Sequence, residues 1–390
     1  MAEFNVALRT TMRGVMAACA LSVAGSVAGL ALAAAPREPP SPDVLSPAQW
    51  KKVDEGVDRG LAWLAAQQKP DGSMPTFQTG EPGVTSLAVM AFLSRGHCPG
   101  GGPYGAIIDR GIDFVLSQQR EDGLLYASAT EMPYTRYQGS HTATYNHAIA
   151  GLMLGEAYGM TDGKRAEKIR PTIEKAIGFA RRLQRRPNPH DKDKFGWRYY
   201  QYVNKAGKGE ADLSATGWFV MFFRSAKNAE FDIPQEYVDD AVRFVKACYL
   251  PQEGTFIYAP YPVDIRPSRA MNGAGLLCLT ITGNHDDRIA ETVGRKIIDN
   301  SFANYNNPSP HDRYHYGAYY CSQAMFMLGG DYWRKFYPNL ATTLLANQAP
   351  QGNWQPESAN NDGVYGSCYT TALAILSLTP PYQMLPIYQR

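Results

Sequence analysis

Aromatic side chains gather in the most apolar segments of this 390-residue chain. A ring face attracts a cation or stacks on a sugar, and the ring body can hold a lipid. The alternative is ordinary core packing with locally satisfied hydroxyls, which we expect for most of them. The density between Tyr314 and Tyr320 predicts that some rings line a cavity. Our candidate ligand-binding residues are Trp218, Tyr316, Tyr319 and Tyr320, with Tyr145, Phe219, Tyr314, Tyr365 and Tyr369 in similar segments.

Two short polar segments precede apolar runs and could supply an acid or a base. In Glu210-Ala211-Asp212-Leu213-Ser214-Ala215, the Asp212 side chain is placed to accept backbone N–H groups as a helix N-cap. In Asp312-Arg313-Tyr314-His315, Tyr314 with Arg313 and His315 is a loose candidate for a general base. Neither segment alone identifies a reaction, because the fold decides which other side chains lie beside it.

The sequence lacks the motifs of several common enzyme and cofactor-binding families. It has no G-x-S-x-G elbow, P-loop, dinucleotide fingerprint or EF-hand loop, so we predict no cofactor and no metal site. With 38 basic and 36 acidic residues, the charge balance implies no nucleic-acid partner. The cysteines are widely spaced without C-x-x-C, which favours small buried side chains over a disulfide framework.

The chain repeats itself. Asp58-Arg59-Gly60, Gln67-Gln68 and Asp71-Gly72 recur 51 residues later as Asp109-Arg110-Gly111, Gln118-Gln119 and Asp122-Gly123. A period of about fifty residues indicates stacked or ring-closed units, none of which buries its apolar face alone.

Each unit reads as an amphipathic helix, a turn and an enclosed helix. Val53, Val57, Leu61 and Leu64 form one apolar stripe, whereas the segment from Thr85 to Leu93 is apolar on nearly every side. Continued along the chain, this alternation predicts six helix pairs and hence twelve helices in two concentric rings. We expect a closed ring, because the terminal units lack the polar face that an open stack requires.

The N-terminus reads as an export signal. Arg9 and Arg13 precede an apolar run that ends in Ala31-Leu32-Ala33, a small-x-small cleavage site. A retained membrane anchor is the alternative, since the run is nearly long enough to span a bilayer. We therefore predict a signal peptide over 1–33, a proline-rich tether over 34–47, the toroid over 48–380 and a tail over 381–390, in an exported protein with membrane proximity as a further option.

At Gln348-x-x-x-Gly352-x-Trp354 the chain resembles the Q-x-x-x-G-x-W repeat of the squalene cyclases and the protein prenyltransferase β subunits. The segments starting at Gln68 and Gln119 look like further copies, and Phe195-Gly196-Trp197 and Gly254-Thr255-Phe256 look like decayed ones. The repeat has a physical role, since Gln bonds helix-end backbone, Gly permits the turn and Trp packs over it. The resemblance implies an all-α, six-fold (α/α)6 toroid with a central cavity.

The resemblance also implies roles for three residues. Asp212 takes the place of the middle, proton-donating aspartate of the cyclase D-x-D-D-T/S-A segment, although Glu210 and Leu213 replace two of its acids. His315 takes the place of the zinc-binding histidine in the D-x-Y-H stretch of the prenyltransferases. Arg269-Ala270-Met271-Asn272 stands where that family has its other ligands, so the zinc set is incomplete.

Three functions are left open at this point. The first is acid-initiated cyclisation of a polyprenoid, a terpene-cyclase or mutase reaction with Asp212 as acid. The second is a non-catalytic module that binds or scaffolds a hydrophobic ligand, a glycan or a protein. The third is a polysaccharide lyase or hydrolase that uses Tyr314 and His315.

Overall fold

The computed structural model describes residues 42–77, 79–126, 139–161, 163–188, 190–200, 211–261, 263–264, 268–284, 286–300, 302–305, 312–357 and 361–389. The chain divides into two units, residues 1–36 and 37–390, and the following concerns the second alone. The predicted signal peptide and most of the predicted tether lie outside the described residues.

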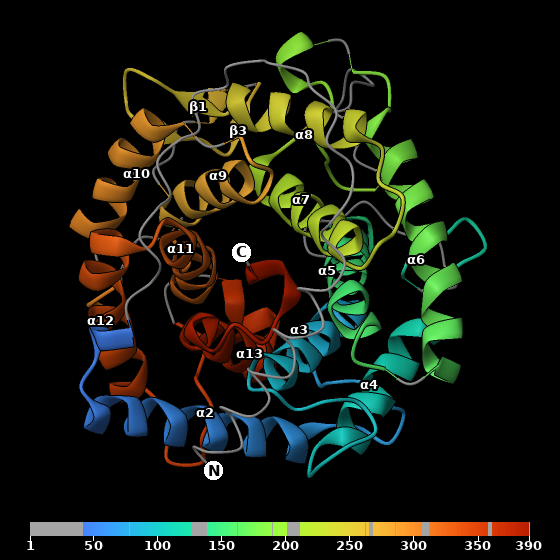
Figure 1. Cartoon of the computed structure of the whole chain (residues 1–390). Coiled ribbons are helices and arrows are strands. Elements are labelled where there is room, and N and C mark those ends of the chain that lie inside the picture. The colour runs from blue at the N-terminus through green and yellow to red at the C-terminus, as the bar shows by residue number, and fades with distance from the viewer. Residues whose placement is uncertain are drawn as a thin grey trace, which may run out of the picture. The chain divides into compact units, whose positions relative to one another are not determined.

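Twelve α-helices occur in this described part of the chain, and they alternate between an outer and an inner ring (Figure 1). The outer helices are α2 (Pro47–Gln67), α4 (Gly105–Ser117), α6 (Gly163–Gln184), α8 (Gln235–Ala247), α10 (Asp287–Asp299) and α12 (Gly330–Ala346). The inner helices are α3 (Glu81–Ser94), α5 (Gly139–Tyr158), α7 (Leu213–Asn228), α9 (Arg269–Ile281), α11 (Tyr314–Leu328) and α13 (Gly366–Leu378). The predicted all-α toroid is confirmed.

Four short strands accompany the helices after α8. They form two antiparallel hairpins, β1 (Tyr249–Leu250) with β2 (Thr255–Phe256) and β3 (Ala259–Pro260) with β4 (Val263–Asp264). The first hairpin contains Gly254, predicted as part of a decayed repeat turn. These strands shape a connection between helices and leave the architecture all-α.

Burial follows the two kinds of helix. In α10 only one stripe is buried, formed by Ala290, Val293, Gly294 and Ile297. In α3 every residue from Pro82 to Ser94 is buried. An amphipathic helix needs one apolar neighbour, whereas an apolar helix must be covered all round, so these sequences settle into the outer and inner rings respectively.

The ring is closed. Each inner helix packs against the next, and α13 returns to α3, while α12 returns to α2 in the outer ring. The first and last helix pairs thereby cover each other, as the missing polar face on the terminal units predicted.

The repeat motif joins neighbouring units through its glutamine. Gln348 Nε2 donates to Gly352 O (2.7 Å) in its own turn and to Gly56 O (2.8 Å) in α2. Gln68 bonds Gly72 O and Ile107 O in the same manner, and Gln119 bonds Gly123 O and Thr172 O. Each glutamine donates to a carbonyl of its own turn and to a carbonyl of the next outer helix, so it joins two units of the ring.

The motif glycines are required by the backbone. Gly72, Gly123 and Gly352 have φ of 91°, 92° and 106°, which is strained for any other residue. A Cβ on Gly352 would also lie 2.6 Å from the carbonyl oxygen of Arg59 in α2. The turn therefore packs directly on the neighbouring helix.

A further copy of the motif is split by an insertion. Gln184 Nε2 donates to Phe195 O and Tyr237 O (both 3.1 Å), and Trp197 Nε1 donates to Ala180 O (2.9 Å) as Trp354 Nε1 does to Leu344 O (2.7 Å). Phe195 holds the glycine position with φ of 73°. The sequence reading identified the second half of this copy and missed its glutamine.

The C-terminal segment ends at the centre of the inner ring (Figure 1). Leu385, Ile387 and Tyr388 are buried, and the short helix η5 (Pro386–Tyr388) packs on α7. Asn228 Nδ2 donates to Pro386 O (3.1 Å), and Ile387 N donates to Glu156 Oε2 (3.1 Å). The predicted tail is thus part of the core.

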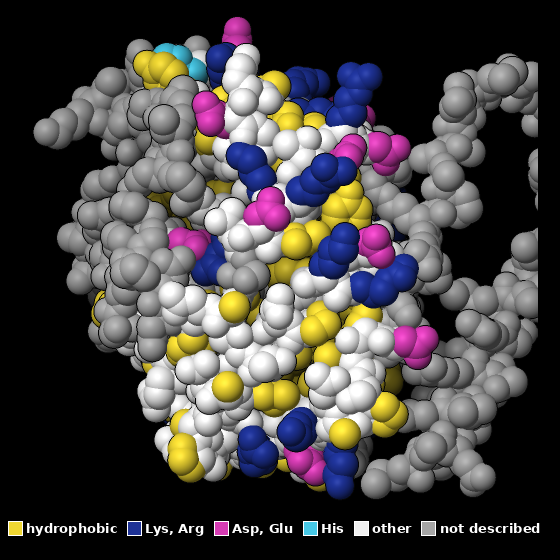
Figure 2. All heavy atoms as spheres, turned by 90° about the vertical axis from the view of Figure 1, so that its left-hand side faces the viewer, with side chains coloured by type: hydrophobic (Ala, Val, Ile, Leu, Met, Phe, Trp, Pro, Cys, Tyr) yellow, Lys and Arg dark blue, Asp and Glu magenta, His cyan; other side chains and the backbone are white. Residues whose placement is uncertain are grey.

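The outer surface mixes charges of both signs. Figure 2 shows basic and acidic side chains interspersed on the face over α10 and α12, where Arg295 pairs with Glu291 and Arg334 with Asp331. Within the described ranges, no helix combines the length and apolarity needed to cross a bilayer.

Candidate functional site

Asp212 lies at the start of inner helix α7 and is fully buried. Its Oδ1 accepts the Ala215 N–H (2.7 Å), which makes it the N-cap that the sequence analysis proposed. Its Oδ2 accepts Arg198 Nη1 (3.1 Å), and the Tyr258 hydroxyl is a third donor. The carboxyl group is therefore held in one orientation by a helix end, a guanidinium and a phenol.

Tyrosine hydroxyls extend this network on two sides. The Tyr258 and Tyr199 hydroxyls are 3.1 Å apart, and Arg198 lies over both rings. On the other side, Ser214 Oγ lies 2.9 Å from the Tyr145 hydroxyl and 2.8 Å from the Tyr316 hydroxyl. The Tyr258 and Tyr199 hydroxyls are thus joined to the buried acid, and a second set of hydroxyls lies at the same end of α7.

Burial sets the protonation of this cluster. It raises the pKa of Asp212 above the ordinary aspartate value, against the lowering effects of Arg198, the Ala215 N–H and Tyr258. It also raises the pKa of Tyr145, Tyr199 and Tyr258, and that of Tyr316 to about 12. The phenols consequently stay protonated at neutral pH and are better donors than bases.

The structure brings the four predicted ligand-binding residues together. Trp218 stacks on Tyr319 (centroids 5.1 Å apart) and contacts Tyr320 (5.4 Å), and its Nε1 donates to the Tyr316 hydroxyl (3.0 Å). Tyr316 is 8% exposed and the other three are at most 1% exposed. These rings chiefly pack on each other, and Tyr316 links them to Ser214 and the Asp212 end of α7.

His315 belongs to a separate network in α11. Its Nδ1 lies 2.7 Å from Glu357 Oε2, and its Nε2 lies 3.0 Å from the Tyr305 hydroxyl, which also donates to Gln355 O (2.7 Å). Both ring nitrogens are hydrogen-bonded, so coordination of a metal would break one of these bonds. No cluster of three or more His, Cys, Asp or Glu suited to a metal occurs among the residues described.

Tyr314 is likewise held in the packing beside this network. Its hydroxyl donates to Phe302 O (2.8 Å), its backbone N–H donates to Glu357, and burial raises its pKa. Asp312 pairs with Arg269 (2.6 Å), the residue that opens α9. The segment from Asp312 to His315 thus connects the start of α11 to the neighbouring turns.

Sequence reasoning missed Arg198, Tyr199, Tyr258, Tyr305 and Glu357. A signal for four of them exists in the repeat. Arg198 and Tyr199 follow Trp197, Tyr258 follows Phe256 by two residues, and Glu357 follows Trp354 by three. Arg198 and Tyr199 lie at the start of the inner helix that follows them, α7. Tyr258 and Glu357 instead contact the starts of the inner helices that precede them, α7 and α11.

Comparisons with known proteins give a fold and no close relative. No family model and no curated protein matches the chain. A type II terpene cyclase, MstE from Scytonema, solved with geranylgeranyl dihydroxybenzoate, is 13% identical with a TM-score of 0.56 and covers 87% of this chain and 100% of its own. An α-1,6-mannanase, GH76A from Salegentibacter, solved with α-1,6-mannotriose, is 8% identical with a TM-score of 0.58 and covers 85% and 99%.

A glycosidase solved with glucose is 11% identical with a TM-score of 0.57 and covers 87% of this chain and 100% of its own. Every one of these proteins is matched over nearly its whole length. Together with the two closed rings and the bridging glutamines, these matches show that the chain has the α/α-toroid fold shared by type II terpene cyclases and toroid glycosidases.

Proposed function

We propose that the protein catalyses acid-initiated cyclisation of a polyprenoid, with Asp212 as the proton donor. The observation that carries this proposal is a fully buried carboxyl group with a raised pKa at the start of an inner helix, set among aromatic side chains. Desolvation favours the protonated form of an acid, and ring faces stabilise the carbocation formed when that proton reaches a carbon–carbon double bond.

Arg198 has a defined part in this reaction. Its charge beside Asp212 Oδ2 stabilises the carboxylate left after proton transfer, which makes the protonated form a stronger acid. The Tyr199 and Tyr258 hydroxyls offer a route by which the carboxylate regains its proton. Among the solved MstE structures are variants that replace an aspartate, an arginine or a tyrosine, the residue types gathered here.

The test must separate an acid from a helix cap. Asn caps a helix about as well as Asp, so Asp212→Asn removes the acid and keeps the cap at Oδ1, while its amide nitrogen replaces the Oδ2 that accepts from Arg198. We expect this variant to fold and to lose cyclised product when the protein is given squalene or geranylgeranyl dihydroxybenzoate, with products identified by gas chromatography–mass spectrometry. Glu291→Gln, an exposed substitution in α10, is the matched control and should retain the wild-type yield.

Two other results would redirect the assignment. If wild-type protein cyclises no polyprenoid but cleaves an α-mannan or another glycan, the carbohydrate-active alternative replaces this one. If neither occurs, Asp212 has only a structural role, as the helix cap and the ion-pair partner of Arg198, and the toroid is a binding module. The export signal proposed for residues 1–33 would place either activity outside the cytoplasm.

A further inference from the structure

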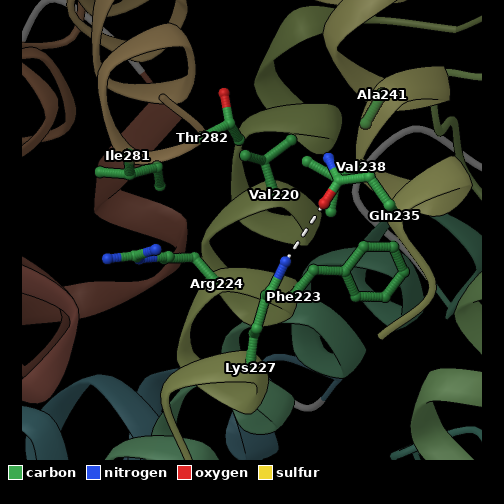
Figure 3. A pocket seen from close by; sticks show the side chains of 9 residues that line it. All are labelled: Val220, Phe223, Arg224, Lys227, Gln235, Val238, Ala241, Ile281 and Thr282. Atoms are coloured by element: carbon green, nitrogen blue, oxygen red, sulfur yellow. Dashed lines mark hydrogen bonds between the residues drawn. The ribbon is translucent and has the colours of Figure 1, made fainter. Parts of the chain in front are cut away.

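A pocket opens at the opposite end of α7 from Asp212. It lies between the last turns of α7 and α9 and the first half of α8, with a volume of about 50 Å³ (Figure 3). A single water needs about 10–15 Å³ on the same measure, so the pocket can hold a small organic molecule. Arg224 stands twelve residues beyond Asp212 on the same helix, which at 1.5 Å per residue is about 18 Å away.

The lining combines an apolar wall with two cationic side chains that extend in different directions (Figure 3). None of the nine lining residues is acidic, and Arg224 and Lys227 are both basic. In Figure 3, Lys227 reaches toward Gln235, whereas the Arg224 guanidinium lies on the side of Ile281. The apolar wall is formed by Val220, Phe223, Val238, Ala241 and Ile281.

Arg224 differs from the other arginines that are withdrawn from solvent. Arg181, Arg198 and Arg269 each form an ion pair, with Asp240, Asp212 and Asp312 respectively. Among the described residues, by contrast, no group forms a hydrogen bond or ion pair with Arg224, and its Nε is buried without a partner. Leaving a donor unmatched in this way costs free energy that a bound acceptor would recover.

The neighbouring charges leave the pocket positive. Glu156 attracts Arg224 electrostatically, but its own oxygens accept from Ser225 Oγ and Ile387 N. Lys227 Nζ donates to the oxygen of Gln235 (3.2 Å), and the Gln235 amide group turns away to Asp239 (3.0 Å). No lining residue therefore neutralises the charges of Arg224 and Lys227.

We propose that this pocket binds a small aliphatic carboxylate. The planar guanidinium of Arg224 matches a carboxylate with two parallel hydrogen bonds, and the Lys227 ammonium adds charge at the rim. The wall of Val220, Ile281 and Val238 suits a short alkyl group, and the volume excludes a long chain. Inorganic phosphate would satisfy the cations but leave that wall uncovered.

Butyrate is the probe, and binding to the full chain is followed by saturation-transfer NMR and by calorimetry. We expect saturable binding in the millimolar range, weakened about tenfold or more in Arg224→Gln and less in Lys227→Gln. Val238→Phe should abolish binding by filling the pocket while both charges remain. Arg295→Gln, an exposed arginine in α10, is the control and should bind as wild type.

Three results would overturn the proposal. The first is butyrate binding that does not saturate, and the second is binding unchanged in both Arg224→Gln and Val238→Phe. The third is inorganic phosphate binding as tightly as butyrate, which would indicate an adventitious ion only. Butylamine, which has the same alkyl chain and the opposite charge, should not bind. Because the readout is binding at α7's far end, these outcomes are independent of any cyclase activity.

Discussion

Each carboxyl oxygen of the buried Asp212 accepts a hydrogen bond from a different donor, Ala215 N–H at Oδ1 and Arg198 Nη1 at Oδ2. As an N-cap it accepts the Ala215 N–H, and as a desolvated carboxyl group next to Arg198 it is the residue that we propose as the proton donor. These roles are compatible because capping uses Oδ1 and the ion pair uses Oδ2. The sequence alone could place Asp212 at a helix start, but its partners come from connections far along the chain.

Glu156 allows a test of burial at the residue scale. Desolvation raises its pKa from the ordinary value of 4.5 to about 7, against the lowering effects of Ser225, Ile387 and Arg224. The unfolded chain therefore loses this proton at lower pH than the folded protein does. The resulting stabilisation is complete below about pH 4.5 and is lost as pH rises through 7, a change of about 3 kcal/mol in unfolding free energy.

Glu156→Gln should remove this dependence. A glutamine imitates the protonated acid, because its oxygen can accept the Ile387 N–H while its NH2 group donates to Ser225 Oγ. The Ser225 hydroxyl can then donate its own proton to Leu152 O, 3.3 Å away. Urea denaturation at pH 5.5 and pH 8 should show a smaller loss of stability in the variant than in wild type. An identical loss in both proteins would assign the pH dependence to another group. Glu291→Gln, at an exposed position, should behave as wild type.

At the scale of the element, the repeated turn joins each helix pair to the next one in the ring. Its glycine, glutamine and aromatic residue are local in sequence, so the motif could be recognised, and helix periodicity predicted the twelve α-helices of the described residues. The split copy shows the limit of that reasoning. Its Gln184 and Trp197 are separated by an insertion, and only the folded chain shows that they perform the same function as Gln348 and Trp354.

Gly352→Ala should destabilise the protein by about 1–3 kcal/mol, because the residue has φ of 106° and the added methyl would meet the backbone of Arg59. Gly363→Ala is the matched control, since a Cβ there meets no atom within 4 Å. Thermal and urea melts of the two variants measure the difference. Equal stabilities would mean that the turn can shift away from α2 at little cost.

At the scale of the whole molecule, the two rings were predictable and the filling of their centre was not. The absence of a polar face on the terminal units predicts closure, and α13 does return to α2 and α3. The final residues are rich in proline and read as a tail. Their burial depends on apolar surface supplied by several inner helices, which no local pattern reveals.

A chain that ends at Gln383 should be markedly less stable. It lacks Leu385, Ile387 and Tyr388, whose burial contributes about 4 kcal/mol or more together. Urea denaturation and binding of a hydrophobic dye should report lower stability and newly exposed apolar surface. Gln389→Ala, which alters an exposed side chain, is the control. An unchanged unfolding midpoint in the truncated chain would show that the tail contributes little to the core.

The packing of the C-terminal segment at the ring centre also affects the order in which parts of the protein can fold. During synthesis the first helix pair emerges well before the α12 and α13 segments that cover it. The segment from Leu385 to Tyr388, which packs at the centre of the inner ring, is made after all of these helices. The apolar faces of the first helix pair that α12 and α13 cover therefore stay uncovered until those helices have been made. A partner fused directly to this segment would disturb the packing of Ile387 and Tyr388 against α7.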